Sequence, residues 1–330
     1  MKRRRFVSCL TALAVIGASG AAARDAGQRS ARVGWLIWSD KGRYHEITSR
    51  AFVEGLRAAG YSEGENLIIE RRVAQGDLRR QREQARELAQ LGIDVFFAPT
   101  KTAADAAWYA SRKIPTVIAT VTDPVAVDYV KSLARPGLHI TGVTSASAEL
   151  SGKRLELLHE AVPAAARIGV LFDQTLYDSC REEIKQFDAA AKKLGVILIK
   201  VAISSPADVE SAFRKLNEAR AQALIMPLFT SEVDMVPEIA RQAIKHRIPT
   251  MHEIDDFAET GGLMTYGPDF ADVYRRAASY VARILRGERP AEMALEEPRQ
   301  FKFIVNLQTA RQLGLTLPES IMLRADEVIR

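Results

Sequence analysis

The residues best suited to hold an anionic group are Thr100, Lys101 and Thr102, which stand directly before a predicted helix. Two hydroxyl groups and the free backbone N–H groups of a helix start can bind a carboxylate, and the helix dipole favours it. The alternative is that the threonines only cap the helix. Lys101 could add positive charge to the site or point to solvent.

Glu253 offers the opposite charge from the other half of the chain. A carboxylate can hold an ammonium group through charge-assisted hydrogen bonds, and the alternative is a surface carboxylate in water. We expect Glu253 to face the ammonium of a ligand, so that Glu253→Gln would weaken binding by about 1.5–3 kcal/mol.

Aromatic residues follow several predicted strands and could enclose an apolar or aromatic part of a ligand. Such residues also pack within lobes, so we expect two of these four to contact the ligand: Tyr44, Tyr177, Phe229 and Phe257. In open α/β sheets, ligands bind outside the carboxyl ends of the strands. That rule selects the remaining candidates, which are Ser39, Thr122, Asp123, Asp173 and Thr230.

The layout of these candidates indicates a zwitterion with an apolar body. Hydroxyl and ammonium donors come from the first half of the chain, and the carboxylates Asp173 and Glu253 come from the second. An amino acid or a related aromatic acid fits this pattern better than a sugar does. Trp35 is expected in the core, whereas Trp38 could reach the mouth of the cleft.

Motifs for covalent, nucleotide or metal chemistry are missing from the sequence, which contains no G-x-G-x-x-G, no Walker A and no G-x-S-x-G. None of the three His-Glu pairs continues to H-E-x-x-H. The loop from His252 to Asp256 could in principle hold a metal, but a solvated acidic turn is the favoured interpretation. The sequence therefore predicts a binding protein with no cofactor and no metal.

The elements that position these residues occur twice. Ala31–Leu36 (ARVGWL) recurs as Ala166–Leu171 (ARIGVL), and Lys113–Thr116 recurs as Arg247–Thr250. Apolar runs of strand length alternate with helical segments in each copy, which predicts parallel sheets covered on both faces. We therefore expect an α/β fold of two similar Rossmann-like lobes that enclose a cleft.

The expected strands are 33–38, 66–73, 93–98, 115–120, 167–172, 196–202, 223–227, 249–252, 262–267 and 301–306. The expected helices include 46–59, a helix capped by Asp77, 177–194, 207–219, 232–245 and 270–285. The C-terminal part of the chain, from about residue 262 on, is expected to return to the first lobe and then cross again to the second. This path gives a three-strand hinge, with crossings near 144–148, 258–264 and 296–301. The first lobe would comprise 31–145 and about 265–297, and the second 146–264 and about 298–330.

Residues 1–23 resemble an export signal. A basic start, an apolar stretch and Ala21-Ala22-Ala23 fit a cleaved signal peptide, and Arg3–Phe6 also fits the twin-arginine pattern. Export could use the Sec or the twin-arginine route, and an uncleaved anchor is the alternative. Cleavage would leave Cys180 as the sole cysteine, expected as a buried thiol, which is compatible with a periplasmic protein.

The net charge of +5 belongs mostly to the signal, because removing its four basic residues leaves about +1. No basic stripe interleaved with aromatic residues indicates nucleic-acid binding. No later run reaches the length of a membrane span of about 18 apolar residues.

In its motifs and in their order along the sequence, the chain resembles the tryptophan/tyrosine-type ABC transporter substrate-binding proteins, which have the type I periplasmic binding fold. The resemblance covers almost the whole mature chain and rests on Arg3–Phe6, Gly55–Tyr61, Asp123–Val125, Arg135–Gly137, Thr141–Val143, Lys153–Leu158, Gly261–Gly267, Arg283–Gly287, Asn306–Ala310 and Arg324–Ile329. It implies capture of a ligand in the periplasm and delivery to an ABC permease and its ATPase, without fixing the ligand.

The chain departs from the family at Lys101, because family members often have a turn of small residues before this helix and Lys101 is bulky and cationic. We expect a monomer. The alternatives are a periplasmic sensor of the same fold that reports to a membrane receptor, and an exported α/β enzyme.

Overall fold

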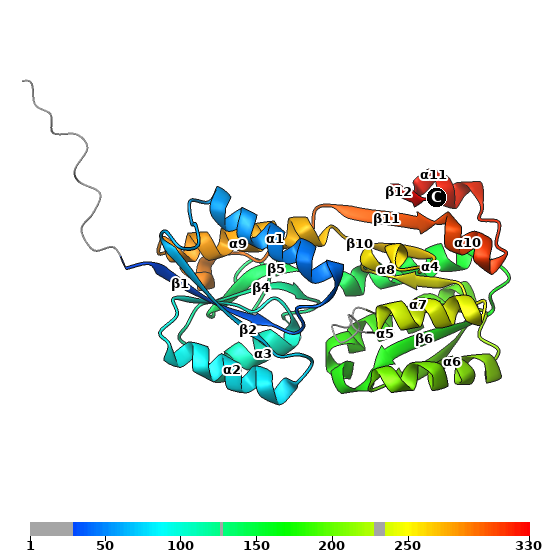
Figure 1. The fold of residues 1–330 in the computed structure, drawn as a ribbon, viewed down its shortest axis with the longest axis horizontal. Coiled ribbons are helices and arrows are strands. Elements are labelled where there is room, and N and C mark those ends of the chain that lie inside the picture. Colours follow the sequence, from blue (N-terminus) through cyan, green and yellow to red (C-terminus); the bar gives the residue numbers. More distant parts are fainter. Residues whose placement is uncertain (1–28, 126–127, 228–234) are drawn as a thin grey trace, which may run out of the picture.

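The computed structural model describes residues 29–125, 128–227 and 235–330, and these form two α/β lobes that lie side by side (Figure 1). The sheet of the first lobe has the strand order β2-β1-β3-β4-β5, and all of its pairs are parallel. Its strands are β1 (Ala31–Ile37), β2 (Leu67–Val73), β3 (Val95–Phe97), β4 (Thr116–Val121) and β5 (Ile140–Thr144).

The sheet of the second lobe repeats this order as β7-β6-β8-β9-β10 and extends it with β11 and β12. Only the pair β10–β11 is antiparallel among the described strand pairs of this sheet. Its strands are β6 (Arg167–Asp173), β7 (Ile197–Ile203), β8 (Ala223–Ile225), β9 (Thr250–His252), β10 (Met264–Pro268), β11 (Phe301–Asn306) and β12 (Glu327–Ile329). The predicted fold class of two similar lobes with parallel sheets is confirmed.

Helices cover both faces of each sheet (Figure 1). Those of the first lobe are α1 (Gly42–Ala58), α2 (Leu78–Gln90), α3 (Lys101–Ala110) and α9 (Phe270–Leu285), with the 3₁₀ turn η4 (Pro290–Glu292). Those of the second lobe are α4 (Ser147–Ala161), α5 (Tyr177–Leu194), α6 (Val209–Glu218), α7 (Val236–Lys245), α8 (Asp256–Glu259), α10 (Leu307–Leu313) and α11 (Glu319–Arg324), with the turns η1 (Gln174–Leu176) and η2 (Pro206–Asp208). Within the described ranges, none of these helices is long and apolar enough to cross a bilayer.

Several local signals act as predicted. Asp77 caps α2 by accepting hydrogen bonds from the backbone N–H groups of Arg79 and Arg80 at 2.8 and 3.1 Å. Gly195 ends α5 at φ 72°, a left-handed conformation that glycine adopts without a steric penalty. Cys180 is the buried thiol expected on α5.

Within the part of the chain that the structure describes, three crossings connect the lobes. The first crossing joins β5 to α4 at Ser145–Ala146, and the third follows Glu296, whose backbone hydrogen bonds to Gly142 and Thr144. The second crossing lies between Pro268 and Phe270, later than the expected 258–264, because β10 pairs with both β9 and β11 in the second sheet. After it, α9 packs on α1 in the first lobe.

Candidate ligand-binding site

A cavity of about 60 Å³ lies between the two lobes, at the carboxyl ends of the central strands. That position is where open α/β sheets bind ligands. The described residues that line it are Trp35, Ile37, Trp38, Ser39, Tyr44, His45, Thr48, Pro99, Thr100, Thr120 and Tyr274 from the first lobe, and Val236, His252, Ile254, Asp256 and Phe257 from the second.

The wall from the first lobe is mainly aromatic. Tyr44 packs edge-on against Phe270 and Tyr274, with ring centroids 5.3 and 6.3 Å apart. Burial raises the pKa of Tyr44 well above its ordinary value and raises the pKa of Tyr274 to about 12. Both phenols therefore keep their protons at neutral pH and present apolar faces with hydroxyl donors.

The wall from the second lobe combines His252, Phe257 and Asp256. The ring of His252 meets that of Phe257 at 5.4 Å, and its Nδ1 accepts a hydrogen bond from the backbone N–H of Ile254 at 3.2 Å. An accepting Nδ1 assigns the ring proton of the neutral imidazole to Nε2.

Asp256 is the one carboxylate among the described lining residues. Burial raises its pKa, and the backbone N–H of Tyr44 partly offsets this effect by hydrogen bonding to the carboxylate. The charged groups that face Asp256 are Arg43, Glu46 and Asp255. Within the described ranges, no three His, Cys, Asp or Glu residues gather closely enough to hold a metal ion.

The lobes touch each other around this cavity. Arg43 at the start of α1 forms an ion pair with Glu259 of α8 at 2.5 Å. Trp38 and Ala74 of the first lobe pack with Leu176 of the second in one buried apolar cluster. The structure therefore has its lobes in contact, with the cavity between them.

Four of the residues predicted from strand ends line the cavity: Ser39, Tyr44, Thr100 and Phe257. Thr100 also caps α3, since its Oγ1 accepts a hydrogen bond from the backbone N–H of Ala103 at 3.3 Å. The capping role that the sequence offered for Thr100 is therefore present, and its role in binding an anion stays a prediction.

Other predicted residues from the first lobe lie outside the described lining. Lys101 pairs with Asp105 one turn along α3 at 2.8 Å, and the hydroxyl of Thr102 lies 3.1 Å from that of Thr100. Thr122 follows β4 and does not line the cavity, and neither does Asp123, which accepts a hydrogen bond from the backbone N–H of Val125.

The candidates Asp173 and Tyr177 in the second lobe also have local roles. Asp173 caps η1 by accepting hydrogen bonds from the N–H and the hydroxyl of Thr175 at 2.7 and 2.6 Å. Tyr177 is 36% exposed and packs against Phe172. Phe229 and Thr230 lie outside the described residues.

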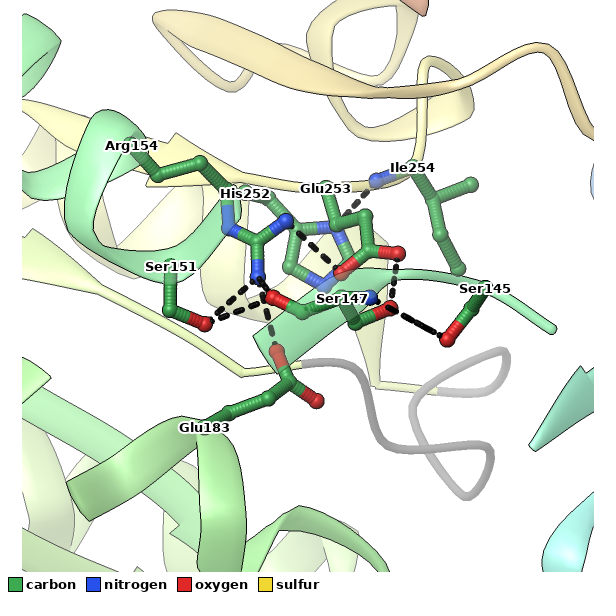
Figure 2. Close-up of polar contacts among 8 residues, drawn as sticks. All are labelled: Ser145, Ser147, Ser151, Arg154, Glu183, His252, Glu253 and Ile254. Carbon is green, nitrogen blue, oxygen red and sulfur yellow. Dashed lines mark hydrogen bonds and ion pairs between the residues drawn. The ribbon is translucent and has the colours of Figure 1, made fainter. Parts of the chain in front are cut away.

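The structure gives Glu253 a different partner from the expected ligand ammonium. Its carboxylate is buried, lies 2.9 Å from the guanidinium of Arg154 and accepts a hydrogen bond from Ser147 at 2.5 Å (Figure 2). The chain bends at Glu253 and Ile254, directly after β9 ends at His252. His252 and Ile254 line the cavity, whereas Glu253 lies outside the described lining and contacts Arg154 and Ser147.

Sequence reasoning missed several lining residues. Ile37 and His252 are the last residues of β1 and β9, so a stricter use of the strand-end rule would have found them. Trp35 is buried in the core as expected and also lines the cavity. Thr48 lies one turn after Tyr44 on α1, which was a usable signal. Tyr274 comes from α9, and only the return of the tail to the first lobe brings it to the cavity.

The sequence model of the family described as "ABC transporter substrate binding protein" matches residues 40–329. The chain belongs to this family. A similar curated relative is "Tyrosine-binding protein" from Clostridioides difficile (strain R20291), which is 26% identical over 266 residues, 81% of this chain and 76% of the relative.

Solved structures of similar fold place this substrate-binding protein among the type I periplasmic binding proteins. A conserved domain protein from Vibrio cholerae has a TM-score of 0.84 and 26% identity, with 92% of this chain and 100% of that chain covered. A protein from Streptococcus pneumonia in complex with L-Trp has a TM-score of 0.84 and 23% identity, with 91% and 100% covered. A ligand-free, open substrate binding protein from Clostridium difficile has a TM-score of 0.66 and 25% identity, with 92% and 99% covered.

Proposed function

We propose that this protein is the periplasmic solute-binding component of an ABC importer. It captures an aromatic amino acid, or a closely related aromatic acid, in the cavity between its lobes and delivers it to a permease and its ATPase. The observation that carries the proposal is the aromatic cavity, to which both lobes contribute side chains. Export by the Sec or the twin-arginine route belongs to the same proposal.

The apolar part of the ligand is assigned to the aromatic wall. Trp38, Tyr44 and Phe257 line the cavity from opposite lobes, so a ring between them is enclosed from both sides. The names of the relatives support this choice, because one is called tyrosine-binding and another was solved with L-Trp.

The charged groups of the ligand are assigned to two further residues. Asp256 replaces Glu253 as the partner of the ammonium group, since it is the one acidic residue among the described residues that line the cavity. Thr100 at the start of α3 stands where backbone N–H groups and the helix dipole favour a carboxylate.

Closure of the lobes on the ligand completes the proposal. The ion pair of Arg43 with Glu259 and the packing of Trp38 on Leu176 exist only while the lobes touch. The lower TM-score against the ligand-free, open relative than against the L-Trp complex supports a second, open arrangement. A ligand that binds the touching arrangement better shifts the population toward it and changes the surface shown to a permease.

The test is isothermal titration calorimetry with L-tyrosine, L-tryptophan and L-phenylalanine, with glucose and myo-inositol as controls. Asp256→Asn should weaken the amino-acid complex by about 1.5–3 kcal/mol, the range for a hydrogen bond to a charged group. Asp255→Asn is the matched control, because this neighbouring carboxylate caps α8 and does not line the cavity. Binding of sugars alone, or equal losses in both variants, would refute the ligand assignment.

X-ray scattering tests closure separately. Saturating ligand should reduce the radius of gyration, and an unchanged profile with a bound ligand would contradict the clamp. Uptake by membrane vesicles that carry the cognate permease and ATPase tests delivery.

A further inference from the structure

A buried polar network lies directly behind the cavity wall of the second lobe (Figure 2). Its centre is Arg154 of α4, whose side chain is fully buried between the carboxylates of Glu183 and Glu253 at 2.8 and 2.9 Å. Desolvation of such charges costs several kcal/mol per ion, so each must have partners in a fixed geometry. The hydrogen bonds that Arg154 donates to Ser147, Ser151 and Glu183, and the one that Ser147 donates to Glu253, connect the members of the network.

Ser147 connects this network to the chain that crosses between the lobes. Its hydroxyl lies 2.5 Å from a carboxylate oxygen of Glu253 and 2.7 Å from the hydroxyl of Ser145. The one hydroxyl proton of Ser147 faces two acceptors, the carboxylate oxygen of Glu253, which can only accept, and the hydroxyl oxygen of Ser145. Ser145 belongs to the first crossing, directly after β5.

The backbone and side chain of Glu253 also lie close to Gly267 of β10, the strand that leads to the second crossing. A Cβ added at Gly267 of β10 would lie 2.2 Å from the backbone oxygen of Glu253, so only glycine fits there without a shift. Contacts with Ser147 and Gly267 fix this residue relative to two of the three crossings.

The same residue stands between two parts of the cavity wall. His252 and Ile254 line the cavity, and their backbone is joined to the Glu253 backbone on either side. A shift of the Glu253 backbone therefore moves these two residues as well.

We propose that Glu253 is a positioning residue for ligand binding. Its carboxylate, held by Ser147 and Arg154, fixes the wall formed by His252 and Ile254 relative to the crossing between the lobes. The inference rests on the proposed function for the identity of the ligand, whereas the order of the wall can be measured without a ligand.

The test compares Ser147→Ala with Ser151→Ala. Both serines are buried on α4, one turn apart, and both accept hydrogen bonds from Arg154, through the carbonyl of Ser147 and the hydroxyl of Ser151. Ser147 alone of the two bonds to Glu253. Ser147→Ala should weaken binding of L-tyrosine or L-tryptophan by about tenfold, as expected for loss of a hydrogen bond to a charged group. Ser151→Ala should lower the melting temperature and leave the affinity within about twofold.

Hydrogen exchange of the ligand-free protein provides the second measurement. Backbone amides of residues 250–255 should exchange faster in Ser147→Ala than in Ser151→Ala. Equal affinities or equal exchange in the two variants would overturn the positioning role. If the wild-type protein binds neither amino acid, the proposed ligand is wrong, and the exchange comparison alone decides the role of Glu253.

Discussion

Replacement of Arg154 by methionine should be one of the most damaging single changes in the second lobe. The variant removes the cation that lies within 2.9 Å of both Glu183 and Glu253, and both carboxylates stay buried. Breaking a buried ion pair by removing one partner costs about 3–5 kcal/mol. At about 2–4 °C per kcal/mol for a unit of this size, the melting temperature should fall by about 6–20 °C.

Neutralising Arg154, Glu183 and Glu253 together should recover most of the stability that is lost in Arg154→Met. In the triple variant Arg154→Met, Glu183→Gln and Glu253→Gln, no buried charge of the three remains. Replacement of a complete buried ionic group by well-packed apolar side chains of similar volume is often close to neutral in stability, and glutamine keeps the volume of glutamate without its charge. The recovery distinguishes an electrostatic cost from the loss of packing by the arginine side chain.

Urea unfolding should be followed by two signals. All three tryptophans, Trp35, Trp38 and Trp108, belong to the first lobe, so their fluorescence reports that lobe, whereas far-ultraviolet circular dichroism reports both. A loss below about 1 kcal/mol in Arg154→Met, or a triple variant no more stable than the single one, would refute the reasoning.

Three further outcomes are expected. Gly267→Ala places a Cβ 2.2 Å from a backbone oxygen and should destabilise by about 1–3 kcal/mol, whereas Gly152→Ala in α4 meets no atom closer than 3.8 Å and should be neutral or stabilising in thermal unfolding. Trp38→Ala should abolish measurable amino-acid binding in calorimetry, while Trp108→Ala, outside the cavity lining, should leave the affinity unchanged; equal losses would contradict the site. Burial raises the pKa of Asp256 from 3.8, so the stability associated with its protonation is complete below that value and is lost as the pH rises through the raised one. Asp256→Asn should therefore be more stable than wild type at pH 7 and lose this advantage near pH 4; a pH-independent difference in melting temperature would contradict the shift.

The repeated pattern in the sequence was enough to predict the fold class. The copies ARVGWL and ARIGVL became β1 and β6, and each lies second in the same order of parallel strands. Local capping signals such as Asp77 and Gly195 also acted as predicted, because they depend on residues a few positions away.

The strand-end rule identified part of the cavity lining for the same reason. Ser39, Tyr44, Thr100 and Phe257 line the cavity because parallel strands end at one edge of their sheet. The rule fixes where a loop lies, but it does not fix which way each side chain in the loop points. Glu253 points away from the cavity toward Arg154, which is 99 positions earlier in the chain.

The sequence by itself determined the duplicated lobes, most of their strands and helices, and the loops that meet between them. The tertiary structure decided which sheet β10 joins, because its pairing with β11 depends on hydrogen bonds to a segment more than 30 residues away. It also decided that Asp256 lines the cavity while Glu253 is buried outside the described lining. Both outcomes depend on partners distant in sequence, and local periodicity and charge carry no information about such partners.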